Sequence, residues 1–534
     1  MALIIRKATA GDAVGWLQFL KEALGSDPVA EQVYDLNRVA DQLIGPQVEE
    51  TWVAEVDGKL RGSIAILGTS TANNNPVANL GRHLALPENY RDGTAGALIR
   101  GINTVCDQRK QIAVLRVAAS DDAQQRLIEE LGYVCVGFQP LKHLCMVREG
   151  ILFYVRVGAP ESLARLPLSQ PLPQITELAS AALNHLLLPN PELLRDGVTG
   201  YPLQTDLQIE ESTIEVYDGC KQEAQESNPP VEISGRFNRG LGMLRVTADT
   251  PVRALLGRRG LRNVAGLCYY FDERDKCVRL VDSFATDDLS AGALVRHAVK
   301  LAHERFNAVY VEVDFLVDAP RMLKSAEQLG FVPVAYLPGF YNCSVCCVDV
   351  VKMVKLNAVY SLDNANLTPH ARRIMEIVDR NFQDQKVGVA VIHLLRGLSM
   401  FDGLGDGELG KVARIFAQKL YRAGEKVFNK GDSSNEAYIV MRGQIDICLE
   451  ENAAPVASIG SGAIIGEQAF LDGAPRNAMG TAAQPSILLV VQRPAFNTLV
   501  QSEPHLGMVV MRNIALEVSN KLRKASAALA AAGN

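Results

Sequence analysis

The segment Gly466–Ala478 gathers the residues of this chain that are best suited to bind an anion. It reads GEQAFLDGAPRNA, with Glu467 near its start and Arg476 near its end. The guanidinium group of an arginine matches phosphate oxygens in a bidentate pair. Backbone N–H groups at the start of a short helix after Gly466 would also face an anion. We therefore predict a phosphate-binding site at Gly466 and Arg476.

A second run of small residues, from Arg91 to Gly96, also precedes a predicted helix. Gly93 and Gly96 flank Thr94 and Ala95, so backbone N–H groups at the helix start can approach a ligand closely. Arg91 would add a positive charge beside them. We predict a pyrophosphate site at Arg91, Gly93, Thr94, Ala95 and Gly96; a plain helix start is the alternative.

The elements that must position these residues form a repeat. Thr94–Leu141 and Ser290–Phe340 each contain an AGAL turn, a helix, a β-rich run, a second helix and a Leu-Gly-aromatic-Val segment. Ile112–Val117 and Ala308–Val313 are typical of buried strands between amphipathic helices. We therefore predict a βαβ-like unit that occurs twice in the chain.

Strands and hairpins are predicted before each copy. Asp57-Gly58 should form a hairpin turn, and Asp12 should cap the first helix. Residues 158–202 are expected to form a helical connector, and Gln222–Val231 a loop. Alternating apolar residues and turn signals indicate the strands Ile4–Arg6, Thr51–Val56, Gly62–Leu67, Gly266–Phe271 and Cys277–Val281.

The last third of the chain has a different pattern. Residues 359–402 show helical spacing, and the short strands after them are punctuated by glycine, which favours a small barrel or jelly roll. A final amphipathic helix is expected between Glu503 and Lys524. Its apolar residues are Leu506, Val510, Ile514, Val518 and Leu522.

Composition excludes several classes of protein. The 534-residue chain has a formal charge of −6 and a pI of about 5.9, which argues against sequence-independent nucleic-acid binding because that needs a basic surface. No apolar run approaches the roughly 20 residues of a membrane span. Charged residues interrupt the N-terminus, so we predict no signal peptide. We expect a cytoplasmic protein, in keeping with ten dispersed cysteines.

Cys343, Cys346 and Cys347 form the one tight cysteine group. A C-x-x-C pair can bind metal or do redox chemistry, but a closed zinc site needs four ligands and no second pair has ligand spacing. The surrounding residues alternate like a half-buried strand. We favour a structural role and predict no metal site.

The anion-binding segment and its flanking glycine turns resemble the cyclic-nucleotide-binding domains of kinase regulatory subunits, channels and catabolite-activator regulators. The resemblance runs from about Leu398 to the C-terminus and implies a β-roll with a lid helix. It implies a nucleotide site formed by Gly466, Glu467, Arg476, Asn477 and Ala478. In that site Glu467 accepts a hydrogen bond from the ribose 2′-hydroxyl, and Arg476 pairs with the cyclic phosphate. The favoured nucleotide is cAMP.

Three residues depart from that family's pattern, namely Ile465, Gln468 and Met479. A barrel that no longer binds a nucleotide is therefore the alternative. No helix-turn-helix is recognisable after the predicted lid, so we do not expect a DNA-binding regulator.

The repeated units resemble GNAT-type N-acetyltransferases. In the first copy the resemblance rests on Asn79–Leu98, with its Pro-x-x-Tyr-Arg lead-in, and on the helical run Ala123–Tyr133. It implies that acetyl-CoA or another acyl-CoA binds by its pyrophosphate at Arg91–Gly96. The loop departs from the family at Thr94, where glycine is usual.

The second copy resembles a degenerate GNAT domain. It has no arginine before its loop, and Asp287 and Asp288 would repel a pyrophosphate. Gly292 is expected to be kept for helix packing.

The first copy lacks both catalytic groups that are usual in the family. Asn79 stands where a glutamate is common, and Leu127 or Ile128 where a tyrosine is common. The resemblance therefore assigns no catalytic residue. Nearby ionisable residues are His83, Glu88 and Tyr133.

The predicted fold is α+β. Residues 1–150 would form a GNAT-like domain, 151–357 a second, degenerate one, 358–397 a helical linker and 398–534 the cyclic-nucleotide-binding domain. The predicted function is acylation of an amine, plausibly a protein lysine, by an acyl-CoA under cyclic-nucleotide control. The alternative is a non-catalytic regulatory or scaffold protein that binds a partner enzyme. We expect no nucleic-acid or membrane partner, and a homo-oligomer is possible.

Overall fold

The computed structural model divides into two compact units, Met1–Phe382 and Gln383–Asn534, which we call the sheet unit and the C-terminal unit. None of the helices among the described residues is both long and apolar enough to cross a membrane. The structure describes residues 3–24, 43–45, 48–67, 76–85, 89–90, 92–144, 147–160, 163–165, 173–190, 198–203, 206–226, 251–342, 346–358, 360–404, 406–413, 415–433, 435–451, 453–513, 515–516, 519 and 523.

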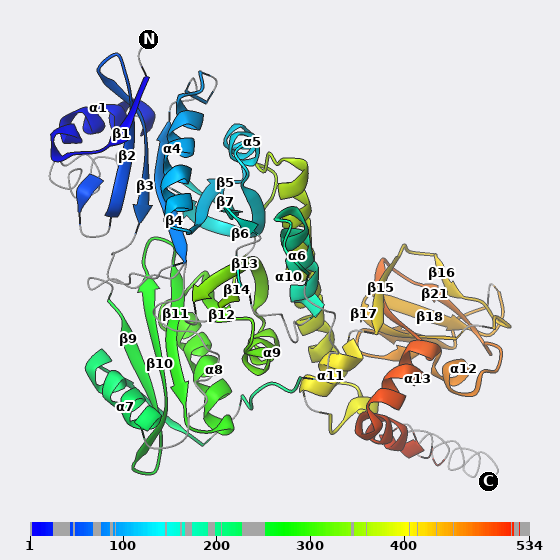
Figure 1. The fold of residues 1–534 in the computed structure, drawn as a ribbon. Coiled ribbons are helices and arrows are strands. Elements are labelled where there is room, and N and C mark those ends of the chain that lie inside the picture. Colours follow the sequence, from blue (N-terminus) through cyan, green and yellow to red (C-terminus); the bar gives the residue numbers. More distant parts are fainter. Residues whose placement is uncertain are drawn as a thin grey trace, which may run out of the picture. The chain divides into compact units, whose positions relative to one another are not determined.

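The sheet unit is built around one 14-stranded sheet, and its first half contains the first copy of the repeat (Figure 1). The strand order in this half is β1-β2-β3-β4-β5-β7-β6. Its elements are β1 (Leu3–Lys7), η1 (Ala10–Asp12), α1 (Ala13–Leu24), β2 (Val48–Val56), β3 (Lys59–Leu67), β4 (Val77–Ala85), α4 (Thr94–Gln108), β5 (Ile112–Ala118), α5 (Asp122–Glu130), β6 (Val134–Leu144) and β7 (Val147–Arg156).

The second half repeats this order in mirror image, β13-β14-β12-β11-β10-β9-β8. A connector helix, α6 (Pro173–His185), lies between the halves in sequence. The elements of the second half are β8 (Gln208–Ser212), α7 (Ile214–Glu226), β9 (Arg253–Arg259), β10 (Arg262–Asp272), β11 (Cys277–Ala285), α8 (Asp288–Glu304), β12 (Tyr310–Leu316), α9 (Pro320–Gln328), β13 (Val332–Asn342) and β14 (Cys347–Leu356).

The two halves join where β6 pairs with β13, and the residues that meet there are equivalent in the repeat. Gly137 pairs with Ala335, and these residues end the matching runs GYVCVG and GFVPVA. A Cβ atom on Gly137 would lie 2.2 Å from the Cβ of Ala335 and 2.6 Å from the carbonyl oxygen of Val334. Glycine is therefore what lets the backbones approach at this join.

A buried ion-pair network crosses the same join. Lys142 of β6 contacts both Asp275, at 2.6 Å, and Glu312 of β12, at 3.3 Å. Arg279 of β11 contacts Glu312 at 3.0 Å. Burial opposes ionisation of Glu312, but the surrounding cations outweigh it and hold its pKa well below the usual value. The network ties the second half to β6 of the first.

One parallel strand pair in each half separates partway along its length. β4 and β5 pair in parallel from Val77–Ile112 to Leu80–Leu115, yet both strands continue beyond that pairing. β11 and β12 do the same, and their pairing ends at Leu280–Val313. Most other strand pairs are antiparallel. Each half therefore carries an interrupted parallel pair followed by a helix.

Most predicted strands are confirmed with small shifts at their ends. Asp57 and Gly58 form the expected hairpin turn, with φ values of 49° and 79°. The first helical turn is capped differently from the prediction. Thr9 is the N-cap, and Asp12 sits three residues later, where its carboxylate accepts from the Thr9 N–H at 2.7 Å. Asp12 is still a capping residue, because it occupies the third helical position of a capping box whose N-cap is Thr9.

Two other sequence-based predictions need correction. Gln222–Glu226 was predicted as loop but forms the last part of α7, because Tyr217 and Ala224 are buried at helical spacing; the rest of that predicted loop lies outside the described residues. Helix α5 ends at Glu130, and Gly132 with a φ of 84° turns the chain, so Tyr133 is not helical.

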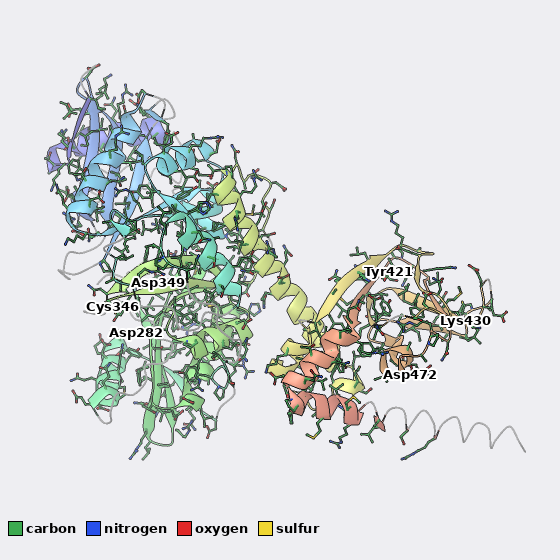
Figure 2. All side chains as sticks on the ribbon, turned by 45° about the vertical axis from the view of Figure 1, so that its right-hand side comes forward. Asp282, Cys346, Asp349, Tyr421, Lys430 and Asp472 are labelled. Carbon is green, nitrogen blue, oxygen red and sulfur yellow. The ribbon has the colours of Figure 1, made fainter. Side chains whose placement is uncertain are left out.

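The connector between the halves is held on the second half by a buried ion pair. Arg165 donates to both carboxylate oxygens of Asp349, at 2.9 and 2.5 Å, and Tyr336 donates to the same carboxylate. Asp349 is labelled in Figure 2. Burial lowers the pKa of Arg165, but the contact with Asp349 outweighs burial and the net shift is upward.

The C-terminal unit consists of helices and two four-stranded antiparallel sheets, ordered β15-β22-β17-β20 and β16-β21-β18-β19. This confirms the prediction of short strands with glycine turns. Its elements, preceded by α10 (Pro369–Arg396), are η4 (Ser399–Phe401), α11 (Asp406–Ala413), β15 (Phe416–Tyr421), β16 (Lys426–Phe428), β17 (Glu436–Arg442), β18 (Gln444–Cys448), β19 (Ala457–Gly460), β20 (Ile464–Ile465), α12 (Glu467–Asp472), β21 (Met479–Ala482), β22 (Ser486–Gln492) and α13 (Arg493–Ser502).

Two apolar cores stabilise this unit. One lies between the sheets and contains Phe428, Tyr438, Ile445 and Leu488. The other packs the helices, and Val391 and Leu395 from the end of α10 share it with Leu506 and Val510. Residues 504–513 are helical, as the spacing of those apolar residues predicted. The end of α10 and this C-terminal helix are therefore parts of one core.

Candidate functional site

The start of α4 carries the first predicted anion site. Gly93 is its N-cap, with a φ of 85° that favours glycine, and it has no side chain with which to cap the helix. Thr94 and Ala95 are buried in the first turn. A Cβ on Gly96 would lie 3.4 Å from Leu127 of α5, so this turn packs closely against that helix. Arg91 lies outside the described residues.

An acidic residue, Asp92, stabilises the backbone just before this turn. Its carboxylate accepts from the Thr94 N–H at 2.8 Å and from Asn89 at 2.9 Å. Burial disfavours the charged carboxylate, but these hydrogen bonds outweigh burial and lower the pKa of Asp92. The amides of Ala95 and Gly96, next in the turn, have no intrahelical acceptor four residues earlier.

The start of α8, the equivalent helix, is already occupied by protein groups. Asp287 is its N-cap and accepts from the Ser290 N–H at 2.9 Å, while Arg259 contacts the same carboxylate at 2.7 Å. A Cβ on Gly292 would lie 2.6 Å from the carbonyl oxygen of Pro202, which confirms that Gly292 serves close packing. The protein therefore caps and covers the N-terminus of α8.

The ionisable candidates near α4 do not form a catalytic group among the described residues. Tyr133 is buried and donates to Asn103 at 2.6 Å, and burial raises its pKa. Glu88 and the side chain of His83 lie outside the described residues. Asn79 lies in the part of β4 that pairs with β5.

The cysteine group is part of the sheet. Cys347 begins β14, and its N–H donates to the carbonyl oxygen of Ala164 at 2.7 Å; Cys343 lies outside the described residues. Within the described ranges, no group of three or more His, Cys, Asp or Glu side chains is arranged to hold a metal ion.

The second predicted anion site surrounds α12, a six-residue helix framed by two glycines. Gly466 precedes it with a φ of 73°, and Gly473 follows it with a φ of 78°. Figure 2 labels Asp472 at the end of this helix and Tyr421 at the end of β15. Left-handed glycines at both ends let the chain enter and leave the helix sharply.

Arg476 lies across the start of α12. It is buried and donates to the carbonyl oxygen of Gly466 at 2.6 Å and to that of Glu436 on β17. A Cβ on Gly466 would lie 2.3 Å from Nη1 of Arg476, so only glycine fits beside the guanidinium. The structure thus brings Gly466 and Arg476 together, as predicted from the sequence.

Two aromatic rings also hold this guanidinium. Its central carbon lies 4.8 Å from the ring centroid of Phe428 and 5.8 Å from that of Tyr438. Burial lowers the pKa of Arg476, although Tyr438 and nearby carboxylates act in the opposite direction. The rings of Phe428 and Tyr438 lie close to the guanidinium, and the sequence motif did not indicate them.

The other predicted residues border α12. Glu467 is half-buried in its first turn, and Ala478 is half-buried just before β21. Asn477 is exposed and donates to the side chain of Gln468 at 3.3 Å. Gln468, one of the departures from the family pattern, is therefore hydrogen-bonded to the residue that follows Arg476.

Arg493 is a further residue of this site that the sequence did not indicate. It lies at the start of α13 and donates to the carbonyl oxygens of Phe470, at 2.6 Å, and Ala469. These carbonyls end α12, where a positive charge is favourable. Phe470 also packs edge-on against Phe496 of α13. Because its partners are backbone atoms brought close by folding, no sequence pattern marks Arg493.

Comparison with known proteins places this site in a family. Residues 418–503 match the model of the cyclic nucleotide-binding domain. The cyclic AMP receptor protein of Thermus thermophilus is 28% identical over 134 residues, 24% of this chain and 60% of that protein. The cAMP-dependent protein kinase regulatory subunit of Yarrowia lipolytica is 29% identical over 106 residues, 20% of this chain and 28% of that one.

A solved structure, the Thermus thermophilus catabolite activator protein, is 27% identical and covers 25% of this chain and 62% of its own, with a TM-score of 0.23. The chain spans 60% and 28% of the length of the two curated relatives above. The match includes Gly466, Glu467 and Arg476. Residues 418–503 are a cyclic nucleotide-binding domain with the β-roll fold of that family.

Proposed function

We propose that the protein is an acyl-CoA-dependent N-acyltransferase whose activity is set by a cyclic nucleotide bound at α12. The favoured nucleotide is cAMP, because two of the similar proteins are a cyclic AMP receptor protein and a cAMP-dependent kinase subunit. Acetyl-CoA or another acyl-CoA is the proposed donor. An amine, plausibly a protein lysine, is the proposed acceptor.

The observation that carries the acyl-CoA part is the difference between two equivalent helix starts. Asp92 at α4 and Asp287 at α8 each accept from a first-turn N–H. The carbonyl oxygen of Pro202 covers the start of α8, whereas the atoms nearest to a Cβ on Gly96 of α4 belong to side chains. A helix N-terminus favours an anion such as a pyrophosphate. The separation of β4 from β5 next to α4 supports the same location.

Transfer of an acyl group to an amine needs a base for the ammonium proton and an acid for the departing thiolate. Asn79 and the buried Tyr133 supply neither, which favours the second candidate, a non-catalytic nucleotide-responsive protein that binds a partner. The first candidate is preferred because correct placement of thioester and amine alone can give large rate accelerations.

The proposed role of the nucleotide follows from the contacts of Arg476. A cyclic phosphate would take hydrogen bonds from the guanidinium that now go to the carbonyls of Gly466 and Glu436. Glu467 would accept from the ribose 2′-hydroxyl. The resulting shift of α12 would reach α13 through Arg493. A coupling of about 1–3 kcal/mol would change acyl-CoA affinity about 5- to 150-fold.

The test is calorimetric titration of the whole protein with acetyl-CoA, with and without saturating cAMP. We expect acetyl-CoA to bind, and its affinity to change with cAMP. Binding of cAMP without binding of acetyl-CoA would contradict the acyltransferase and favour the partner-binding protein.

Replacing Gly93 locates the acyl-CoA site. Gly93→Asp adds a second carboxylate beside Asp92 at the start of α4 and should weaken acetyl-CoA binding at least about tenfold by repelling the pyrophosphate. Gly93→Asn is the matched control, since it has the same shape, tolerates positive φ and carries no charge. Equal affinities for the two variants would place the acyl-CoA elsewhere.

A further inference from the structure

The segment that leads into α10 is attached to α5 of the first half. Gln125 of α5 is fully buried, and its amide donates to the carbonyl oxygens of Asn366 at 3.0 Å and Ala118 at 3.1 Å. The N–H of Thr368 donates back to the Gln125 side chain at 3.1 Å. One side chain therefore holds the end of β5, helix α5 and the start of α10 together.

A second residue of α5 strengthens this attachment. Glu129 accepts from the hydroxyl of Thr368 at 2.6 Å and from that of Tyr154 on β7 at 2.9 Å. His370, in the first turn of α10, donates from Nε2 to the carbonyl oxygen of Cys135 on β6 at 2.9 Å. All of these partners belong to the first half of the sheet unit.

The opposite side of α5 faces the proposed acyl-CoA turn. Gln125 and Glu129 are four residues apart and share one face of the helix. Leu127 is rotated about 200° from Gln125, at about 100° per residue, and points away from that face. Leu127 packs against Gly96, where a Cβ would be 3.4 Å away. Helix α5 thus lies between the start of α10 and the start of α4.

Contacts of the same segment with the second half are placed differently. Asn357 donates from its backbone to the carbonyl oxygen of Val309 at 2.8 Å and from its side chain to that of Ala308 at 3.3 Å. These residues follow the end of α8 and precede β12, so they do not reach the start of α8. The side-chain contacts described at the start of α10 are thus made with the first half.

The far end of α10 belongs to the C-terminal unit. Val391 and Leu395 share a core with Leu506 and Val510 of the C-terminal helix. A single helix, Pro369–Arg396, therefore starts on α5 and ends in the core of the nucleotide-binding unit. A helix shared by two units can couple a conformational change in one to the other.

We infer that cyclic-nucleotide binding controls the first half of the sheet unit through α5. Thr368 attaches α10 to Gln125 and Glu129 of α5. A shift of α5 would then change the packing of Leu127 against Gly96 at the proposed acyl-CoA turn. This rests on the proposed function for its acyl-CoA ligand. The attachment described above involves only residues of the first half, so we assign this control to the first half.

The first experiment is hydrogen exchange of the whole wild-type protein with and without cAMP. It needs no acyl-CoA, so it remains informative if the acyltransferase proposal fails. Protection of residues 122–130 should change with cAMP, while α9, the equivalent helix, should not. A change in α9 without a change in α5 would overturn the inference.

The second experiment removes one attachment. Thr368→Val deletes the hydroxyl group that donates to Glu129. In this variant cAMP should change the affinity for acetyl-CoA by less than about twofold. Thr368→Ser keeps the hydroxyl and should restore the coupling. Tyr360→Phe deletes a hydrogen bond to Asp379 of α10 without touching α5, and should leave the coupling intact.

Binding of cAMP and acetyl-CoA separately should be unaffected by Thr368→Val. Full coupling in that variant, with normal binding of both ligands, would overturn the inference while leaving the proposed function standing. Absence of acetyl-CoA binding in the wild type would defeat the proposed function, and the exchange of α5 would then decide the inference alone.

Discussion

At the scale of single residues, the proposed nucleotide site depends on an arginine that the protein's own groups already contact. Arg476 donates to two backbone carbonyls and lies against two aromatic rings. Its side chain is therefore held in place before any phosphate arrives, which lowers the entropy cost of binding. The same contacts make a ligand compete with Gly466 and Glu436.

Replacement of Arg476 by lysine tests this arrangement. Lysine keeps the charge but cannot make a planar bidentate pair, so cAMP affinity should fall at least about tenfold, the lower range for a charged hydrogen bond. Arg442→Lys, at an exposed arginine of β17, is the control and should bind normally. Calorimetric titration measures both; unchanged affinity in Arg476→Lys would remove Arg476 from the site.

At the scale of elements, helix α10 begins beside a close pair of histidines. The rings of His370 and His185, on α10 and α6, lie 3.6 Å apart at their centroids. Burial, and then His185, lower the pKa of His370 to about 4. The folded protein therefore keeps His370 neutral at pH values where an unfolded histidine is protonated.

This predicts a loss of stability in mild acid. Because the folded pKa is below the unfolded value of about 6.5, the unfolded state gains the proton first, so stability falls from about pH 6.5 down to about pH 4. Urea denaturation should show that the free energy of unfolding is lower at pH 5 than at pH 7 by an amount on the order of 1–2 kcal/mol. The His370→Gln variant should not show this difference.

The glutamine variant keeps a donor for the Cys135 carbonyl, so its fold should persist. His303→Gln removes an exposed histidine of α8 and should retain the wild-type pH dependence. If His370→Gln lost as much stability between pH 7 and pH 5 as the wild type, groups other than His370 would cause the loss.

At the scale of the whole molecule, a duplicated sequence forms one continuous sheet. The order of strands in the second half mirrors that in the first, and equivalent residues meet at the centre. The lysine and glutamine side chains of β6 that join the buried network, Lys142 and Gln139, contact Glu312 of the other half. The close backbone contact at Gly137 and the buried ion pairs therefore both favour pairing of the two halves with each other.

The join can be tested at Gly137. Gly137→Ala would place a methyl group within 2.6 Å of backbone atoms of Val334 and Ala335, so we expect a loss of about 1–3 kcal/mol of stability from overpacking. Gly219→Ala, in the exposed face of α7 with open space around it, should instead stabilise by about 0.5–1 kcal/mol. Denaturant unfolding measures both, and equal effects would argue against a tight join.

The local sequence was enough to predict much of this molecule. Hairpin residues such as Asp57-Gly58, the repeated βαβ pattern and the spacing from Gly466 to Arg476 are all set by residues close together in the chain. Turn chemistry and hydrophobic period act over a few residues, so they can be recognised without a fold. The strands, helices and nucleotide-binding segment therefore followed from the sequence.

Long-range contacts were decided by the tertiary structure. The sequence did not indicate that β6 pairs with β13, that Arg493 caps α12, or that Gln125 holds the start of α10. Gln125 and Thr368 are 243 positions apart. Their partners are backbone groups or single side chains, which leave no periodic or compositional signal. The sequence by itself determined the elements and the anion-binding motif, whereas folding decided which helix connects that motif to the sheet, because only packing brings such distant residues into contact.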